Sequence, residues 1–323
     1  MKALFCCCLI LLTQFPSTKA RKSNRQRVLI TGSSSGIGRE TAYQLAHSLP
    51  SLPLLLHGKT QQRCDNVTAY LPARLGRSHP LACLVADFRR LEEVEAMAAA
   101  IASDYPDLDT VLLNAGVFRL GPSELTADGL DESFQVHYLA HILLLDRLAP
   151  LLARNAPSRA VFTASILHWT ADMGGHWDDF QSNATFTPGS GLYGAFPDVA
   201  NNDMVRYGRA KVYNMLAAGK LGQELGESVT VFSAHPGHWQ TKLSGWTGQP
   251  VEGVRILAYL ASHPSIDQAK SGAYFGDRVF GSWQESLAGH SRVSASEEAR
   301  EKLWLYSTQL LAELGHPLRN IPS

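Results

Sequence analysis

Short apolar runs alternate with amphipathic stretches along most of the chain. Runs of four to seven residues, rich in Val, Leu and Ile, predict buried strands at 27–32, 53–58, 81–87, 110–116, 159–165, 229–235 and 272–275. Apolar positions three and four residues apart predict helices at 36–49, 90–105, 128–154, 203–226, 251–263 and 294–314. This alternation predicts an α/β domain with a mostly parallel sheet, doubly wound, and a ligand crevice at the carboxyl ends of its strands.

The first 20 residues form a separate segment. Residues 3–12 are all apolar, a length that suits the core of a signal peptide and is short for a membrane span. Basic residues follow at Lys19, Arg21 and Lys22, which favours keeping that side in the cytosol. We expect a hydrophobic anchor or signal segment at 1–20 and a single domain at 21–323, on an endoplasmic-reticulum-type membrane with the catalytic domain in the cytosol. A cleaved signal that leads into the secretory pathway is the alternative.

Composition narrows the possible partners. The chain has 323 residues, 45% of them hydrophobic, and 29 basic against 29 acidic residues, so a nucleic-acid partner is not expected. The triplet Cys6, Cys7 and Cys8 offers acylation sites that would strengthen a short anchor. Cys64 and Cys83 show no metal-ligand spacing, and we expect them to be ordinary small apolar residues and not a disulfide framework. N-glycosylation motifs at 66–68 and 183–185 matter only if the domain enters a lumen.

A glycine-rich turn joins the first predicted strand to the first predicted helix. Its sequence, 31–38, reads Thr-Gly-Ser-Ser-Ser-Gly-Ile-Gly. Gly32 permits the tight turn, while Gly36 and Gly38 let the backbone approach a pyrophosphate at the positive end of the helix. We therefore expect a dinucleotide to contact Gly32, Ser34, Ser35, Gly36, Ile37, Gly38 and Arg39.

The residues at the end of the second predicted strand indicate which dinucleotide, NAD(H) or NADP(H), is bound. NAD-selective folds place an acid near the end of this strand, but the sequence here is Leu-His-Gly-Lys, ending at Lys59. Lys59 can pair with a 2′-phosphate, which favours NADP(H). Asp87 would accept from the adenine amine. Asn114, Ala115 and Gly116 would lie beside the nicotinamide ribose, and Pro236, Gly237 and Thr241 beside the nicotinamide.

A tyrosine and a lysine stand four residues apart near the start of a predicted helix. Tyr207 and Lys211 therefore share one face of it. A free tyrosine has a pKa near 10, and we expect the Lys211 ammonium to lower it. Ser165, at the end of the fifth strand, would hydrogen-bond the substrate oxygen. Together these residues predict hydride transfer at carbon coupled to proton transfer at oxygen.

In order and spacing these motifs resemble the short-chain dehydrogenase/reductase superfamily, from about residue 27 to the end. Stretches 134–144, 235–237, 271–275 and 297–311 are similar to the retinol dehydrogenase and WW-domain oxidoreductase group. The resemblance implies a seven-stranded Rossmann sheet, Tyr207 as general acid/base, Lys211 tuning it and holding the ribose, and Ser165 polarising the substrate. Members of this group often carry N-terminal anchors and act on retinoids, steroids or other lipophilic carbonyls.

Two features depart from that resemblance. His137 stands where the superfamily has a catalytic Asn that orders a water in the proton relay; a histidine can replace it or weaken turnover. The separation of Ser165 and Tyr207 is also long, and we expect 168–202 to form a lid over an apolar substrate, or a surface excursion with a small core of its own. The aromatic residues concerned are Trp169, Trp177, Phe180, Phe186, Tyr193 and Phe196.

The sequence thus predicts an NADP(H)-dependent oxidoreductase that acts on a small lipophilic alcohol or carbonyl, with Ser165, Tyr207, Lys211 and His137 at its catalytic site. A catalytically weak or inactive NADP(H)-binding regulatory protein is the alternative, and its main support is His137. The oligomeric state is left open.

Overall fold

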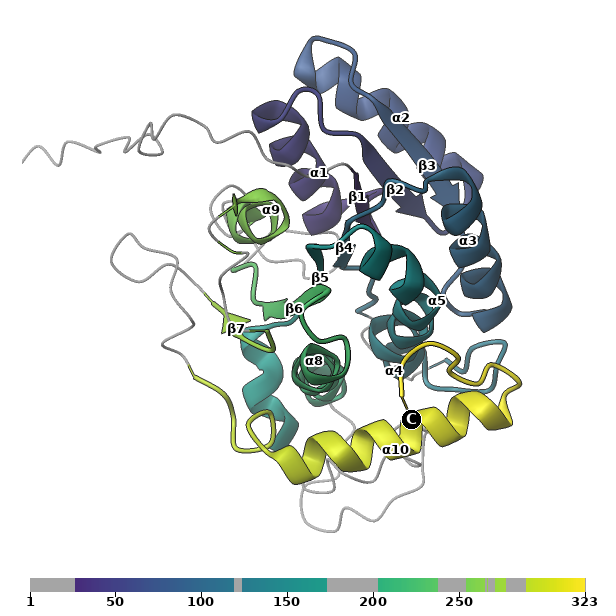
Figure 1. Ribbon diagram of the computed structural model, residues 1–323, viewed down its shortest axis with the longest axis vertical. Coiled ribbons are helices and arrows are strands. Elements are labelled where there is room, and N and C mark those ends of the chain that lie inside the picture. Colours follow the sequence, from purple (N-terminus) through teal and green to yellow (C-terminus); the bar gives the residue numbers. More distant parts are fainter. Residues whose placement is uncertain are drawn as a thin grey trace, which may run out of the picture.

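Seven parallel strands form the centre of the protein (Figure 1). The computed structural model describes residues 27–118, 124–172, 203–237, 254–264, 266, 271–276 and 289–322. The strand order is β3-β2-β1-β4-β5-β6-β7, which is the doubly wound arrangement predicted from the sequence. The strands are β1 (Val28–Ile30), β2 (Leu54–Gly58), β3 (Leu81–Val85), β4 (Thr110–Leu113), β5 (Ser158–Thr163), β6 (Val229–Ala234) and β7 (Tyr274–Phe275).

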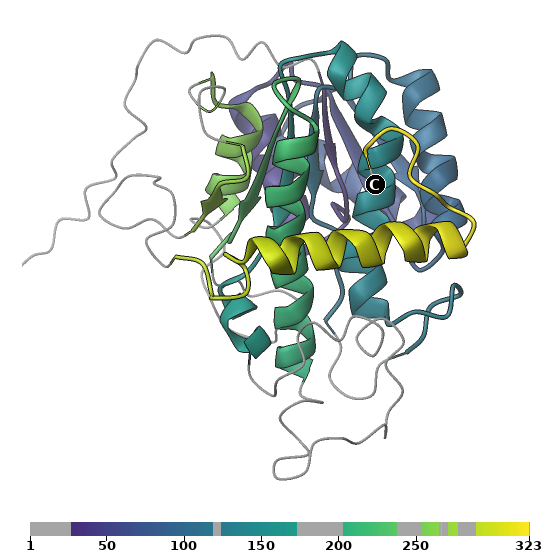
Figure 2. The same cartoon turned by 60° about the horizontal axis from the view of Figure 1, so that its bottom comes forward.

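Helices cover both faces of the sheet (Figures 1 and 2). On one face lie α1 (Gly36–Ser48), α2 (Gln61–Leu75) and α9 (Val254–Ser262); on the other lie α3 (Leu91–Asp104), α5 (Ala140–Arg154) and α8 (Asp203–Glu224). The short α4 (Glu132–Phe134) and a π-helical segment (Gln135–Leu139) run directly into α5, and α10 (Glu297–Glu313) lies near the C-terminus.

Alternation along each strand divides the core into two clusters. Leu29 of β1 lies in register with Leu55 of β2 and Val111 of β4, and all three belong to the core cluster that also contains residues of α3, α5 and α8. Val28 and Ile30 point to the opposite face, against α1 and α9. Because the central strands are buried on both faces, they are largely apolar, and this is why they were predictable from the sequence.

Helix α10 lies across α8 and α5 and closes the outer side of that layer (Figure 2). Trp304 is 2% exposed and donates from its indole N–H to the carbonyl of Pro322. The Tyr138 hydroxyl, on the π-helical segment, is 2.8 Å from the hydroxyl of Ser307. The continuous helix Glu132–Arg154 is the one in the described part of the chain with the length and hydropathy of a membrane span, and 83% of its most apolar 18-residue window is buried inside the protein.

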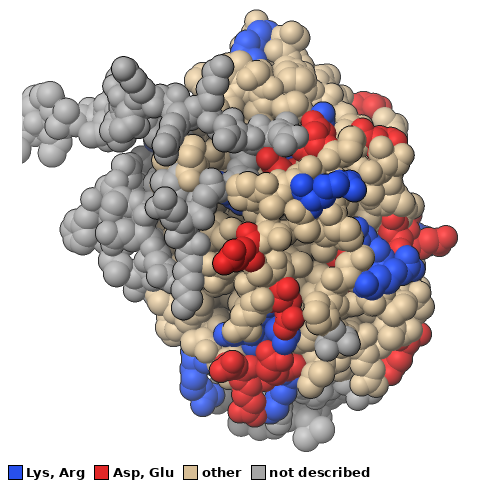
Figure 3. Space-filling model, viewed as in Figure 1, with Lys and Arg blue, Asp and Glu red and all other residues tan. Residues whose placement is uncertain are grey.

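The face shown in Figure 3 carries acidic and basic side chains close together. Two ion pairs link distant elements: Arg27, before β1, pairs with Asp107, before β4, and Arg147 of α5 pairs with Glu95 of α3. Both arginines are mostly buried, so these pairs contribute more to the packing of the elements they join than exposed surface pairs would.

Helix α2 was not predicted from the sequence. It buries only three residues, Cys64, Val67 and Leu71, and it contains Pro72, so its apolar periodicity is weak. The residues at the two ends of α2 are the local signals that indicate a helix. Thr60 caps the first turn by accepting from the N–H of Arg63, and Gly76 ends the helix in the left-handed conformation.

The prediction for Cys64 and Cys83 was wrong, because the structure joins them in a disulfide. Their Cα atoms are 5.5 Å apart although 19 residues separate them in sequence. The right-handed crossover lays the first turn of α2 beside the edge strand β3, a proximity that spacing alone does not reveal. Closing a loop of this length stabilises a fold by about 3 kcal/mol in chain-entropy terms.

Candidate active site

The glycine-rich turn lies at the carboxyl end of β1 and packs tightly against the end of β4. Gly32 has a φ of 64°, and a Cβ at this position would lie 2.7 Å from the Cα of Ala115. A Cβ at Gly38 would lie 2.5 Å from the Nδ2 atom of Asn114 and 2.6 Å from the carbonyl oxygen of Gly32. A larger residue at either position would push the turn away from the sheet.

The N-terminus of α1 opens beside this turn without a side-chain cap. Ser35 is the N-cap in an extended conformation, its side chain makes no capping hydrogen bond, and the first turn contains no acidic residue. The backbone N–H groups here are therefore available to an anion, at the positive end of the helix dipole. This arrangement fits the pyrophosphate of a dinucleotide.

The buried His57 of β2 holds the glycine-rich turn through a hydrogen bond. The N–H of Gly32 donates to Nδ1 of His57 over 2.9 Å, and Nε2 of His57 donates to the carbonyl of Ala86 over 2.8 Å. The ring stacks on Phe88 with centroids 4.4 Å apart. Burial lowers the pKa of His57 to about 4, so the ring is neutral at physiological pH. This role was not predicted from the sequence; the signal was a polar residue inside the otherwise apolar start of β2.

Thr31 and Asn114 join the ends of β1, β4 and β5. The Thr31 hydroxyl accepts from the N–H groups of Asn114 and Ala115, at 2.8 and 2.9 Å. The Asn114 amide donates to the carbonyl of Thr31 over 2.9 Å, and its oxygen accepts from the hydroxyl of Thr163 over 3.4 Å. Asn114 thus serves first as a structural link between strands.

The structure brings Ser165, Tyr207 and Lys211 together beyond the end of β5. The Ser165 and Tyr207 hydroxyls are hydrogen-bonded to each other. Lys211, one turn further along α8, donates from Nζ to the carbonyl of Thr163 over 2.8 Å, and this Nζ lies 5.2 Å from the centroid of the Tyr207 ring. The N–H of Leu167 donates to the Ser165 hydroxyl over 3.2 Å, which fixes the serine side chain.

The expected lowering of the tyrosine pKa is not what the structure shows. Burial raises the pKa of Tyr207 to about 12, although the hydrogen bond from Ser165 acts in the opposite direction. Burial also lowers the pKa of Lys211 to about 7. The ammonium charge that was expected to stabilise a phenolate is therefore only partly present at neutral pH.

His137 lies against this group. Its ring meets that of Tyr207 edge to face, with centroids 5.3 Å apart, and a Cβ at Gly116 would lie 2.4 Å from its Cε1 atom. Nε2 is 2.6 Å from the carbonyl of Val117 and 3.0 Å from the N–H of the same residue, and Nδ1 has no hydrogen-bond partner among the described residues. Burial, and then the charge of Lys211, hold the pKa of His137 well below its usual range.

A second histidine, one helical turn later, connects His137 to the strand ends. Nδ1 of His141 donates to the carbonyl of His137 over 2.9 Å, because a carbonyl only accepts. Nε2 is therefore an acceptor, and the Thr31 hydroxyl donates to it over 3.0 Å. Burial lowers the pKa of His141 to about 3. A role for His141 was not predicted from the sequence.

The remaining predicted cofactor residues are dispersed around the strand ends. The Arg39 guanidinium stacks 4.2 Å above the ring of Tyr70 on α2. Lys59 is exposed directly after β2. Asp87, after β3, accepts from the N–H of Arg89 over 3.1 Å. Gly237 follows β6 with a φ of 81°.

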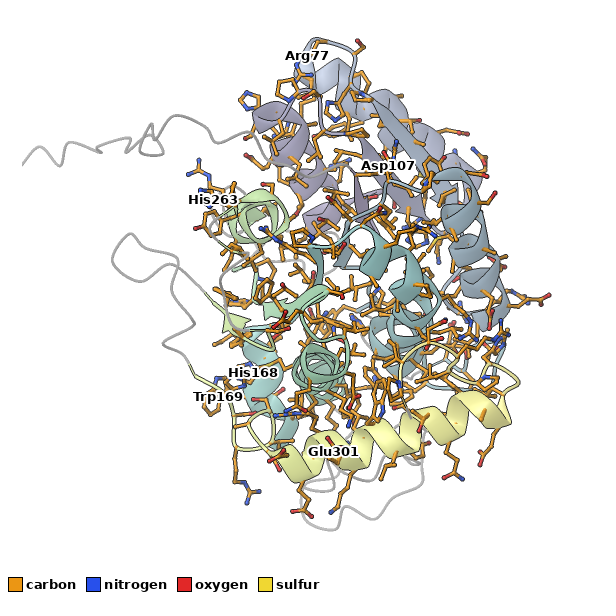
Figure 4. All side chains as sticks on the ribbon, viewed as in Figure 1. Arg77, Asp107, His168, Trp169, His263 and Glu301 are labelled. Atoms are coloured by element: carbon orange, nitrogen blue, oxygen red, sulfur yellow. A yellow bond between two sulfur atoms is a disulfide. The ribbon has the colours of Figure 1, made fainter. Side chains whose placement is uncertain are left out.

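Part of the predicted site lies outside the described residues. This is true of Thr241 and of residues 173–202, which include most of the predicted lid. The described beginning of that segment is a 3-10 helix, Ile166–Asp172. It presents Trp169 with 46% of its surface exposed and holds His168 edge to face with Tyr274 of β7 (Figure 4).

Comparisons with known proteins agree with this geometry. The model of the short chain dehydrogenase family matches residues 26–172. Human retinol dehydrogenase 14 is 30% identical over 281 residues, covering 77% of this chain and 77% of that protein. The human WW domain-containing oxidoreductase is 27% identical, covering 88% of this chain and 68% of that protein. Among solved structures, the Pseudomonas aeruginosa RhlG/NADP active-site complex superposes with a TM-score of 0.58 at 18% identity, covering 79% of this chain and 95% of that one.

The buried histidines His57, His137 and His141 make stability depend on pH. Each has a folded-state pKa below the usual value of 6.5, about 4 for His57 and about 3 for His141, with His137 also lowered. Below pH 6.5 the unfolded chain takes up protons that the folded protein does not. Stability is therefore complete above pH 6.5 and falls as the pH drops toward 4, by roughly 1 kcal/mol per pH unit for each histidine.

Urea unfolding at a series of pH values measures this slope. His57→Asn is expected to lower stability at pH 7, because the hydrogen bond to the carbonyl of Ala86 is lost. Between pH 6.5 and 4 the free energy of unfolding should fall less steeply, by the contribution of one histidine, roughly 1 kcal/mol per pH unit. His47→Asn, which removes an exposed imidazole on α1, controls for the loss of a histidine as such. An unchanged slope in His57→Asn would contradict the neutral state of this ring.

Proposed function

Because the chain belongs to the short-chain dehydrogenase family, we propose that it is an NADP(H)-dependent oxidoreductase that transfers hydride between nicotinamide and a lipophilic alcohol or carbonyl. The observation that carries this proposal is the group formed by Ser165, Tyr207 and Lys211 beyond the end of β5, with Ser165 and Tyr207 hydrogen-bonded to each other. A retinoid, a steroid or an aldehyde is the class of substrate we favour, since human retinol dehydrogenase 14 is among the relatives.

NADPH, when bound, supplies the hydride that is added to the carbonyl carbon. The uncapped start of α1 would hold its pyrophosphate, where Gly32 and Gly38 keep the turn close to the sheet. Lys59, exposed at the end of β2, would pair with the 2′-phosphate, and Asp87 would accept from the adenine amine. Asn114, already bonded to Thr31, would border the ribose.

In the reductive direction, Tyr207 would donate its hydroxyl proton to the substrate oxygen as the carbon receives the hydride. A raised pKa suits this role, because the hydroxyl keeps its proton at neutral pH until negative charge develops on the substrate oxygen. The Ser165 hydroxyl, beside Tyr207, would donate a hydrogen bond to the same oxygen. Lys211, with a pKa of about 7, would return a proton to Tyr207 from solvent.

We assign His137 a positioning role. Its ring fills the space between Gly116 and Tyr207, and it takes the place of the superfamily's catalytic Asn. Its main-chain carbonyl accepts from His141. A neutral imidazole here would limit the hydration of Lys211 and thereby help to keep its pKa low.

The presence of His137 in place of the asparagine also supports a second candidate function. With a histidine in place of the asparagine, and the His137 carbonyl already engaged by His141, a water-mediated relay to Lys211 would be weakened. The protein would then bind NADP(H) without appreciable turnover and act through a partner. Activity measurements separate the two candidates.

Tyr207→Phe tests the proposed reaction. We expect the full-length protein to oxidise NADPH with retinal, a steroid ketone or a medium-chain aldehyde, and the variant to lose at least ~100-fold in kcat, because the proton donor is gone. NADPH affinity, measured by calorimetry, should stay within about 3-fold. Tyr213→Phe on the same helix, where the side chain packs into the core, is the matched control. Retained turnover in Tyr207→Phe would contradict the mechanism, and NADPH binding without turnover in the unchanged protein would favour the second candidate.

Lys59→Ala tests the cofactor preference. Loss of a charge-assisted contact to the 2′-phosphate should raise KM for NADPH by about 10-fold and leave KM for NADH nearly unchanged. Lys302→Ala removes an exposed lysine on α10 and is the control. Equal effects on the two cofactors would show that Lys59 does not read the 2′-phosphate.

His137→Asn tests the positioning role through a pH profile. A smaller side chain would admit water beside Lys211 and raise the pKa of Lys211 from about 7 by about one unit. The limb of the kcat/KM profile that reports the protonated lysine should then move to higher pH by the same amount. His79→Asn, at a histidine that precedes β3, is the control. A lower rate with an unmoved profile would mean that His137 supports packing alone.

A further inference from the structure

The disulfide between Cys64 and Cys83 is a structural bond and lies away from the reactive group. Cys64 is 2% exposed in the first turn of α2, and its sulfur packs beside Gly58 and the carbonyl of Leu84. β3, which carries Cys83, is an edge strand of the sheet. Burial of the Cys64 sulfur, with Cys83 half-buried, limits exchange with soluble thiols, in contrast to the exposed cysteines of redox sensors.

Such a bond bears on the compartment in which the domain folds. Structural disulfides form and persist in the secretory pathway and outside cells, whereas the cytosol keeps thiols reduced. This observation opposes the expectation of a cytosolic domain, which rested on the basic residues Lys19, Arg21 and Lys22. The apolar run 3–12 has the length of a signal-peptide core, so the sequence is compatible with entry into the lumen.

The glycosylation motif Asn66-Val67-Thr68 lies on the same helix, in a geometry that suits modification. Val67 is fully buried, as is the face of α2 that carries Cys64 and Leu71. Asn66 is two residues from Cys64 and so points away from that face, and its side chain is exposed. The Thr68 hydroxyl donates to the carbonyl of Cys64.

We propose that this domain folds in the lumen of the secretory pathway and that Asn66 carries an N-linked glycan. In the transfer, a bond forms between Nδ2 of Asn66 and C1 of the sugar, the C1–oxygen bond to a lipid-linked pyrophosphate donor breaks, and one amide proton is released. In the pairing of Cys64 with Cys83, two thiols lose two protons and two electrons, and a disulfide of an oxidising folding enzyme is reduced to its dithiol.

The fold accommodates a glycan at this position. Helix α2 packs on the face of the sheet opposite α8, which carries Tyr207 and Lys211 (Figure 1). The exposed side of α2 is free of described core contacts near Asn66, since the residues around it, Arg63, Asp65 and Ala69, are also exposed. A glycan would therefore extend into solvent without touching the proposed catalytic group.

Mass spectrometry of the full chain, expressed in eukaryotic cells with its own N-terminus, tests both parts together. Trypsin would release residues 64–74, with Cys64 and Asn66, and residues 78–89, with Cys83. Thiols are alkylated before reduction, and the N-glycan is removed enzymatically, which converts a glycosylated Asn66 to aspartate. We expect the two peptides to be linked until reduction. In most molecules the peptide 64–74 should contain aspartate in place of Asn66, which we call the aspartate mark.

Substitutions at Thr68 provide the matched control. Thr68→Ser preserves the motif and the hydroxyl, and should keep the aspartate mark, whereas Thr68→Ala should lose it, as should Asn66→Gln. Both cysteines alkylated before reduction would overturn the lumenal location. Linked peptides without the aspartate mark in the unsubstituted protein would overturn the assignment of Asn66. Neither readout depends on enzymatic activity, so the outcome is separate from that of the proposed function.

Discussion

At the carboxyl ends of parallel strands, backbone N–H and C=O groups have no partner on a neighbouring strand. In this protein, side chains that hydrogen-bond to these groups determine the arrangement of the candidate site. Thr31 meets the N–H groups of Asn114 and Ala115, and Asn114 returns a bond to the carbonyl of Thr31. Lys211 and Asn214 both donate to the carbonyl of Thr163. The side chains that end the sheet are thus also those that fix the floor of the candidate site, so the site inherits the rigidity of the strands.

The same dense packing decides which groups carry charge. Water is excluded around Lys211, His137 and His141, and each has a pKa below its ordinary value for that reason. For the lysine the result is a proton that can be exchanged near neutral pH. For the histidines it is a fixed neutral ring that can accept a hydrogen bond at one nitrogen while donating at the other. Burial therefore sets the protonation pattern on which a proton relay through Tyr207 would depend.

The sequence predicted what repeated local patterns encode and missed what depends on contacts across the fold. Largely apolar strands and the glycine spacing were enough for the sheet and for the tight turn at the end of β1, because both follow from local geometry. Motif order singled out Ser165, Tyr207 and Lys211, which lie together beyond the end of β5, while their catalytic roles stay a prediction. The roles of His57 and His141 were not predicted, since a histidine in an apolar run gives no sign of its partners. The disulfide was not predicted because α2 was not predicted. Without this helix, the sequence gives no reason to expect Cys64 beside Cys83 of β3.

Helix α2 shows how a weakly apolar element is held in place. It buries three residues fully, and Tyr70 and Leu75 pack against the core as partly buried residues. The additional links are the disulfide to β3, the stacking of Arg39 on Tyr70 and the pairing of Arg74 with Glu40 of α1. These links act on the turn after β2, which carries Lys59. A covalent bond at the edge of the sheet thus holds in position the residue proposed to read the 2′-phosphate, and a domain that folds where disulfides form obtains this order without a larger core.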